Sequence, residues 1–500
     1  MTLIDDYLNE QLKYEKKYGT LTIVLMQVGH FFEAYGVDNK YENINGDNLY
    51  RLSDIMNIQM TRKNKSIIEN SRGNPLMIGV NIYSIDKFIQ ILLNNNYTIV
   101  LIEQTSQPPY VERKVTNIYS PGTNIEYNIK SSTNNLVCMY LENIKQGQYG
   151  KELLCVGICS IDLSTGYNVI YETYSNIDDQ NFAYDEVFRF IQTYDPKELV
   201  IIKKNITMNN DELINYLDLT NRITHIKNYD ECEKTNFNLK YQQDFLEKIF
   251  PKHGLLSIIE YLDLENKNFG LISYIFLLDF AYEHNSNIIQ KINKPIMYDE
   301  NKYLCLANNT INQLNIVSHG NAINCKYDSL LSVINNTSTP IGRRLLRERI
   351  LNPIIDIDVL NERYNYIESF TKKEFNLQND LNDLNVEEQL NNSNSNNSSN
   401  SNNTYVYKKY ESYLTKILDI ERLHRKLGLK LLHPCDFGGL DLSYENVLNI
   451  LEIENDTINK IKPDLNTINK FKEFVECYRR DFDINNIVKY HIDKITDSFF

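Results

Sequence analysis

The chain has 500 residues, 42% of them hydrophobic, which predicts several packed domains and excludes a disordered protein. Its formal net charge of −14 argues against a general nucleic-acid coat, although residues 1–130 are nearly neutral, with 13 basic against 14 acidic side chains. No apolar stretch approaches the roughly 20 residues of a membrane span, and the N-terminus lacks an apolar signal-peptide core. We therefore expect a soluble, intracellular protein that does not bind a membrane.

The first predicted domain covers residues 1–128 and alternates helices with strands. An amphipathic helix opens it, and a short β-branched run over residues 21–28 follows and ends at Gly29. A second helical pattern covers residues 84–97, and strand-like residues 98–104 come directly after it. This order predicts a small mixed α/β sheet with helices.

The second and third predicted domains differ in their periodicity. Residues 132–245 contain long apolar strand patterns, a turn at residues 164–166 and alternating helical and strand-like runs, which predicts a second α/β domain. Residues 246–500 place apolar side chains at three- and four-residue steps, which predicts an all-α domain. Within it, residues 385–405 include a run of only Asn and Ser that cannot build a core, so we expect a disordered insertion there.

Cysteine and histidine clusters give no sign of a metal site. The eight cysteines are irregularly spaced and form no Cys-x-x-Cys pair, so we expect free thiols in a reducing compartment. His424, His433 and Cys435 lack the spacing of a zinc site. We therefore predict no bound metal in this chain.

Residues 28–35, with the sequence Val-Gly-His-Phe-Phe-Glu-Ala-Tyr, resemble the mismatch-reading signature of the MutS family of DNA mismatch repair proteins. Phe31 and Glu33 fall on its Phe-x-Glu pair. A Phe at a strand end is more often a core residue, so the resemblance depends on further matches in the family's order. These matches lie at residues 60–63, 75–80, 99–104, 111–115, 120–123, 339–346 and 419–422. The chain has His30 where the family usually has an acid, and Asn81 and Ile82 where a Pro-Tyr pair is common. Arg349 stands where the family has a Trp.

The resemblance implies that Phe31 stacks on a base as a wedge and that Glu33 hydrogen-bonds the displaced base. An aromatic wedge must overcome the cost of kinking and unstacking the duplex, about a few kcal/mol per step. This cost is smaller at a mismatch, because a mispaired step deforms more easily. We therefore expect Phe31 to provide affinity and Glu33 to provide discrimination against ordinary duplex.

A basic stretch follows the wedge in the sequence. It contains Arg62, Lys63, Lys65 and Arg72 and is offset only by one acidic residue. This stretch is either a solvated loop or, as the family context favours, a set of phosphate contacts. Met77, which lies in the match at residues 75–80, joins Arg62 and Lys63 in the predicted DNA-binding set.

The resemblance also implies the fold of the remaining chain: an RNase H-like connector at 132–245 and a helical core with lever helices at 246–500. Its motif context predicts salt bridges between packed helices, rather than DNA contacts, for Arg343, Arg344, Arg347 and Arg349. Asp162 follows a strand of the connector, and we assign it a structural role because a nuclease site needs several acids around a metal.

The family's energy-converting site is a Gly-x-x-x-x-Gly-Lys-Ser/Thr loop, and no such pattern occurs between residues 1 and 500. We therefore expect a fragment with no catalytic site and no cofactor of its own, followed by clamp and ATPase domains beyond residue 500. The full-length protein is expected to bind ATP, Mg²⁺ and double-stranded DNA with mismatches or small loops, as a homo- or heterodimer formed through its C-terminal domain. The alternatives are a helical DNA-associated scaffold without mismatch discrimination and a metal-dependent nuclease built on the connector.

Overall fold

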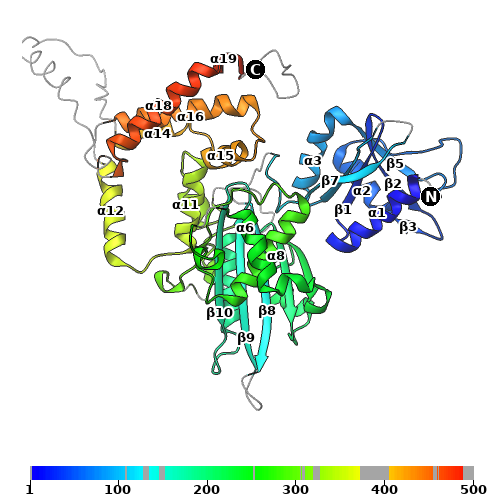
Figure 1. Cartoon of the computed structure of the whole chain (residues 1–500), viewed down its shortest axis with the longest axis horizontal. Coiled ribbons are helices and arrows are strands. Elements are labelled where there is room, and N and C mark those ends of the chain that lie inside the picture. The colour runs from blue at the N-terminus through cyan, green and yellow to red at the C-terminus, as the bar shows by residue number, and fades with distance from the viewer. Residues whose placement is uncertain are drawn as a thin grey trace, which may run out of the picture.

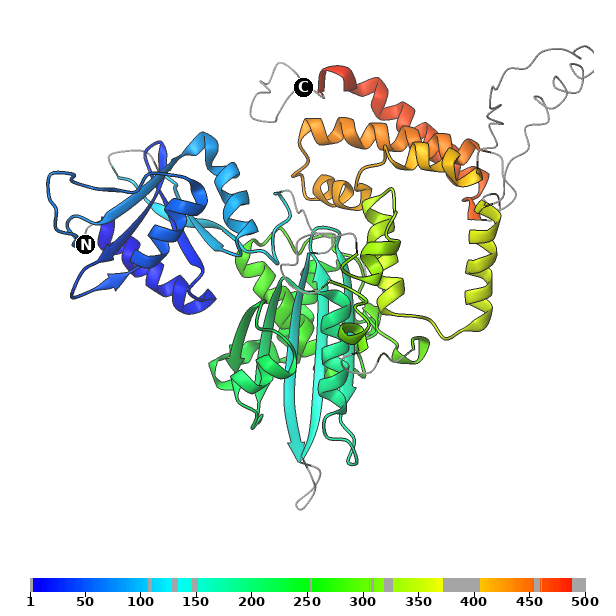
Figure 2. The same ribbon diagram turned by 180° about the vertical axis from the view of Figure 1, so that it is seen from behind.

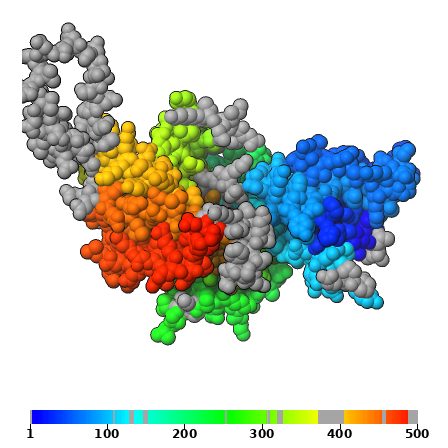
Figure 3. Space-filling view, turned by 90° about the horizontal axis from the view of Figure 1, so that it is seen from above, coloured from blue at the N-terminus to red at the C-terminus, as the bar shows by residue number. Residues whose placement is uncertain are grey.

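The computed structural model describes residues 3–106, 110–127, 134–145, 152–251, 254–304, 306, 310–318, 327–371, 405–453, 459 and 461–487. The predicted insertion at 385–405 lies outside these residues, apart from Tyr405. Figures 1 and 2 show a first sheet with its helices in blue, a second sheet in cyan and green, and a helical part in yellow to red. Seen from above, the first part and the C-terminal helices lie on opposite sides of the molecule (Figure 3). The predicted fold class, α/β followed by all-α, is confirmed.

The first part is a mixed sheet in the order β4-β5-β2-β1-β6-β7, with β3 paired to β2. β1 and β6 run parallel, and the other pairs are antiparallel. α1 is joined to β1 by Gln11, whose side-chain amide bonds the backbone of Thr22 (2.8 Å) and Val24 (2.9 Å). The elements are α1 (Leu3–Tyr18), β1 (Thr22–Val28), β2 (Phe31–Asp38), β3 (Asn43–Ile44), α2 (Gly46–Met56), β4 (Thr61–Arg62), β5 (Leu76–Asn81), η1 (Ile82–Ser84), α3 (Ile85–Asn94), β6 (Thr98–Gln104) and β7 (Arg113–Tyr119).

The second part is a sheet in the order β12-β11-β8-β9-β10-β13. β8, β9 and β10 form an antiparallel meander, and β11 and β12 continue the sheet beside β8 as parallel strands. α8 crosses the meander, and only a glycine at position 157 permits this approach, because a Cβ there would lie 1.9 Å from the Phe269 carbonyl oxygen. The elements are β8 (Asn135–Lys145), β9 (Glu152–Asp162), β10 (Tyr167–Tyr174), α4 (Phe182–Tyr194), β11 (Glu198–Lys204), α5 (Asn210–Tyr216), β12 (Ile223–Asn228), α6 (Leu239–Ile249), α7 (Ile258–Tyr261), α8 (Asn268–His284) and β13 (Ile296–Met297).

Helix α8 packs on the second sheet and strand β13 pairs with it, whereas we expected the helical core to begin at residue 246. α8 is buried on nearly every side against the strands, and β13 pairs with β10 through Val169 and Ile296. Helical periodicity identifies a segment as a helix but does not tell which part of the molecule it packs on. The second part therefore extends about fifty residues further than the sequence pattern suggested.

The helical part is built around α16, which packs with α15 and α18. Its small core contains Leu440, Tyr444, Val475 and Tyr478, and Arg479 forms an ion pair with Asp441 at 2.7 Å. No helix among the described residues is long and apolar enough to cross a membrane. The elements are α9 (Thr310–Gln313), α10 (Leu330–Ile334), α11 (Pro340–Leu351), α12 (Ile357–Thr371), α14 (Val406–Leu414), α15 (Ile420–Gly428), α16 (Pro434–Glu452), α18 (Leu465–Asp481) and α19 (Ile484–Ile487).

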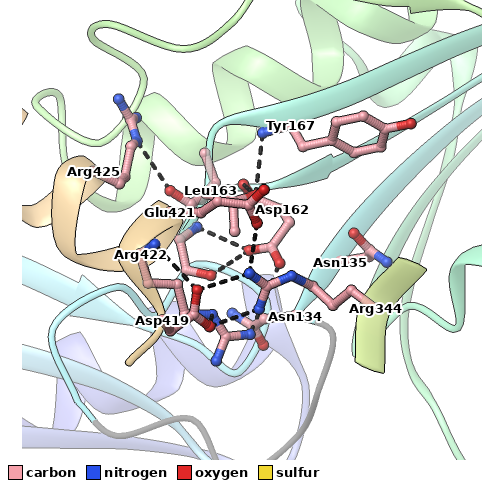
Figure 4. A network of polar contacts seen from close by, with 12 residues as sticks. Asn134, Asn135, Asp162, Leu163, Tyr167, Arg344, Asp419, Glu421, Arg422 and Arg425 are labelled. Carbon is pink, nitrogen blue, oxygen red and sulfur yellow. Dashed lines mark hydrogen bonds and ion pairs between the residues drawn. The ribbon is translucent and has the colours of Figure 1, made fainter. Parts of the chain in front are cut away.

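A polar network joins α11 and α15 to the second sheet (Figure 4). Arg344 makes a bidentate contact with Asp419, at 2.6 and 2.7 Å. Arg425 is buried and donates to the carbonyl oxygens of Leu163 (3.2 Å) and Ile288 (2.6 Å) of the second part. These contacts hold the helices against one end of the second sheet.

The predicted salt bridges are confirmed for two of the four arginines in α11. Arg344 pairs with Asp419, and Arg347 lies 3.5 Å from Asp195. Asp162 is buried at the same junction, where burial raises the pKa of its carboxyl and Arg422, 4.0 Å away, opposes the shift. Its surroundings are those of a structural carboxylate.

Candidate nucleic-acid interface

Phe31, the predicted wedge residue, lies at the tip of a tight hairpin between β1 and β2. Val28 pairs with Phe31, so only Gly29 and His30 form the turn, and Gly29 has a left-handed φ of +61° that favours glycine. Strand alternation turns Phe31 outward, with 47% of its surface exposed, and turns Phe32 into the core. The structure therefore presents Phe31, and not its neighbour, at the end of the sheet.

Glu33 lies two residues further along β2, on the same face as Phe31. Its neighbours across the sheet are Met26 on β1 and Gly79 on β5. The buried Tyr35 hydroxyl donates to Glu33 Oε2, and burial together with Glu33 raises the pKa of Tyr35 well above its usual value. Tyr35 thus remains a donor that holds one carboxylate oxygen of Glu33, and Glu33 stays partly open to solvent.

Met77 and Arg62 lie on opposite faces of the sheet. Met77 pairs with both Tyr35 and Thr61, so it shares the face of Phe31 and Glu33 and is half-buried. Arg62 is half-buried and pairs with Leu76, whose side chain points to the other face. The structure therefore brings three of the five predicted residues to one face, with Arg62 behind it.

The basic stretch contains both accessible cations and a cation that is already held in an ion pair. Lys63 and Lys65 are exposed, and neither they nor Arg62 forms an ion pair with another described residue. Arg72 is held by a bidentate contact with Glu42 and lies 3.8 Å from Asp5. Arg72 is therefore neutralised within the fold, and three cations of the stretch are open to a phosphate.

Sequence reasoning missed a pair of glutamines below the wedge hairpin. The ladder between β1 and β6 ends at Met26 and Ile102. Beyond it, Gln27 Oε1 accepts from the Gln104 backbone N–H (2.9 Å), and the Gln104 side chain donates to the Gln27 carbonyl oxygen (3.3 Å). We call these two residues the glutamine clasp.

The clasp is tied to the hairpin and to β7. Gln27 Nε2 donates to the carbonyl oxygen of Gly29 (3.2 Å), and Arg113 Nε donates to that of Gln27 (3.0 Å). The clasp therefore continues the cross-strand connection by side chains up to the turn that precedes Phe31. Gln104 lies in a family-like segment, but no sequence signal marked Gln27.

A second buried cluster anchors the first part to the second sheet. Glu198, at the start of β11, accepts hydrogen bonds from the Gly122 backbone N–H (3.1 Å) and the Ser120 hydroxyl, and its other oxygen lies 2.8 Å from His225 Nε2. Burial opposes ionisation of Glu198, but His225 and Ser120 hold the pKa of the carboxyl below its usual value. The turn at residues 120–123 is thus fixed by an ionised side chain of the next part.

Two models of one family match the chain. Residues 8–128 match the model described as MutS domain I, and residues 309–488 match the model described as MutS domain III. The first match holds the hairpin that carries Phe31, and the second holds α11 and α15, which carry Arg344, Arg422 and Arg425 in Figure 4. Together they cover more than half of the chain.

Similar proteins carry the same family name. A DNA mismatch repair protein mutS homolog of Acanthamoeba polyphaga mimivirus is 32% identical over the whole of this chain and 44% of its own length. The DNA mismatch repair protein MutS of Caldanaerobacter subterraneus is 26% identical over 97% of this chain and 49% of its own length. The chain therefore belongs to the MutS family, and it spans about half the length of the curated relatives it matches.

Proposed function

We propose that this chain recognises mispaired DNA for mismatch repair, with Phe31 stacked beside the mispaired base. The observation that carries the proposal is the position of Phe31: an exposed aromatic side chain at a hairpin tip, braced by the glutamine clasp. A wedge needs a rigid support, because the duplex resists unstacking by about a few kcal/mol per step. The similarity of the chain to two relatives that are named as mismatch repair proteins supports the same role.

Glu33 is proposed to read the base that Phe31 displaces. A carboxylate normally repels the phosphates of DNA, so its place beside the wedge is unfavourable for a protein that binds any duplex. One of its oxygens is held by Tyr35, which fixes the direction of the other. This second oxygen is available to accept a hydrogen bond from a base whose partner is wrong.

Phosphate contacts and a DNA-facing surface complete the proposed interface. Arg62, Lys63 and Lys65 form no ion pair with another described residue, and we assign them to the backbone of the duplex. Met77 lies on the face of Glu33, and we assign it to the surface that meets the DNA.

The whole protein is proposed to couple recognition to a nucleotide. ATP and Mg²⁺ are assigned to a phosphate-binding domain beyond residue 500, and dimerisation, homo- or heteromeric, to the same region. None of the residues described here is assigned to the nucleotide. A nuclease centred on Asp162 is disfavoured, because Asp162 is committed to Ser164 and Arg422, and no group of three or more possible metal ligands occurs among the described residues.

The test is a binding titration of the full-length protein that contains this chain, with a G·T duplex and a matched duplex. Phe31→Ala removes one base-aromatic stack of about 1–3 kcal/mol, so mismatch affinity is expected to fall about 5- to 140-fold. Tyr50→Ala is the matched control, because Tyr50 has 46% of its surface exposed against 47% for Phe31 but lies on α2. Equal affinity of Phe31→Ala and wild type for the G·T duplex would refute the assignment, and a wild type without mismatch preference would favour the scaffold alternative.

A further inference from the structure

A second exposed aromatic residue stands beside the wedge. Tyr83 has 90% of its surface exposed and lies in η1, the turn that follows β5. β5 pairs with β2, and the residue opposite Phe31 is Asn81. Tyr83 therefore lies only two residues beyond the position paired with the wedge.

The backbone of Tyr83 is fixed to the wedge hairpin. The N–H of Ile82 donates to the carbonyl oxygen of His30 (3.0 Å), which extends the pairing of β5 to the turn itself. The Asn81 side chain accepts from the N–H of Tyr83 (3.0 Å), and the Ser84 hydroxyl donates to the Asn81 carbonyl oxygen (3.0 Å). The turn is thus closed on both sides, and its geometry is set before any ligand arrives.

The ring of Tyr83, by contrast, takes no part in this fold. Within the part of the chain that the structure describes, no hydrogen bond or ring contact involves its side chain. An exposed aromatic ring on a rigid turn offers a π-face, to which any base can stack. The ring is therefore presented to a ligand rather than to the core.

We propose that Tyr83 is a second base-stacking residue, which binds an unpaired base of a loop of two or more nucleotides while Phe31 binds the first. This inference rests on the proposed function of Phe31. A single mismatch offers one weakly paired step, and Phe31 occupies it. Only an insertion or deletion loop supplies a second unstacked base, so Tyr83 extends recognition to this class of lesion.

The spacing agrees with two consecutive unpaired nucleotides. Neighbouring strands lie about 4.8 Å apart, and Tyr83 lies in the turn η1, two residues beyond Asn81, the partner of Phe31 on the neighbouring strand. Phe31 and Tyr83 are thus separated by more than the rise of about 3.4 Å between stacked nucleotides of one strand. Stacked bases in a paired duplex are too close to reach both rings, whereas unstacked bases of a loop can separate.

The experiment compares three duplexes in titrations of the full-length protein: matched, G·T, and one with a loop of three unpaired nucleotides. Tyr83→Ala is expected to lower affinity for the loop about 5- to 140-fold, the loss of one stack, and to leave G·T affinity within about twofold. Tyr83→Phe keeps the ring and is expected to retain loop affinity. Tyr41→Ala is the control, because Tyr41 is 96% exposed and follows the opposite end of β2.

Each outcome separates the inference from the function on which it rests. Selective loss of loop affinity in Tyr83→Ala, with Tyr83→Phe like wild type, supports the inference. Equal losses on all three duplexes, or no loss on the loop, would overturn it while Phe31→Ala still lowers G·T affinity. A wild-type protein that does not prefer G·T to matched duplex would overturn the proposed function, and the inference with it.

Discussion

We predict that the glutamine clasp holds the hairpin that carries Phe31 in place. In Gln27→Leu, the side chain stays apolar near the backbone but loses its terminal amide, and with it both its acceptor and its donor. The bonds to the Gln104 N–H (2.9 Å) and the Gly29 carbonyl oxygen (3.2 Å) are removed, and Arg113 keeps its own bond to the backbone. The hairpin that carries Phe31 is then no longer joined to β6 by a side chain of Gln27.

The size of the effect follows from the hydrogen bonds. A typical bond contributes about 0.5–1.5 kcal/mol, and an N–H left unpaired in a half-buried place costs about 1–3 kcal/mol. Gln27→Leu is therefore expected to lower the free energy of unfolding of the first part by about 1–3 kcal/mol. Because the lost contacts lie at the wedge hairpin, mismatch affinity is expected to fall more than affinity for matched duplex.

A second glutamine provides a matched control. Gln11 also bonds the backbone through both side-chain atoms, to Thr22 and Val24, but it joins α1 to β1 away from the hairpin. Urea unfolding and DNA titration would be measured for Gln11→Leu and Gln27→Leu side by side. If both variants lose similar stability and the same mismatch preference, the clasp has no positioning role and the reasoning is refuted.

Two further predictions concern the cations of the basic stretch and the buried carboxylate of Glu198. Lys63→Ala is expected to reduce the slope of log affinity against log salt concentration by about one, because one phosphate contact is lost. Arg72→Ala is expected to leave the slope unchanged, because Glu42 already neutralises Arg72. Equal slopes for the two variants would contradict this assignment. Glu198 has a folded pKa below its usual value, so its stabilising contribution is present above about pH 4.3, the unfolded value, and is lost as pH falls through the folded pKa. The difference in unfolding free energy between wild type and Glu198→Gln should therefore shrink on acidification below about pH 4.3, and a constant difference between pH 6 and pH 3 would argue against an ionised Glu198.

Local patterns predicted the elements of the first part because their causes are local. Gly29 ends the first strand in the sequence, and in the structure it occupies the left-handed position of a two-residue turn. Strand alternation then separates Phe31 from Phe32 without further information. The family resemblance had placed the wedge at Phe31, and the exposure of its side chain is consistent with that hypothesis.

Partners distant in the sequence account for what the sequence could not predict. Arg72 looked like part of a basic stretch, but its partners Asp5 and Glu42 come from α1 and the loop before β3. The clasp likewise joins two glutamines that are 77 positions apart. Periodicity and composition describe neighbours along the chain, so contacts of this kind appear only when the strands are ordered in space.

The Glu198 cluster and the polar network around Asp162, which attach the other two parts to the second sheet, lie at the same end of that sheet. Glu198, which holds the turn of the first part, pairs with Leu136 of β8. Asn135, the neighbouring residue of β8, pairs with Asp162, which lies beside the arginines of the helical part. The two carboxylates therefore stand on strands separated only by β8, or about 10 Å at the usual strand spacing. This one sheet end fixes the part that carries Phe31 and the helices to each other, which is the rigid support that the proposed wedge requires.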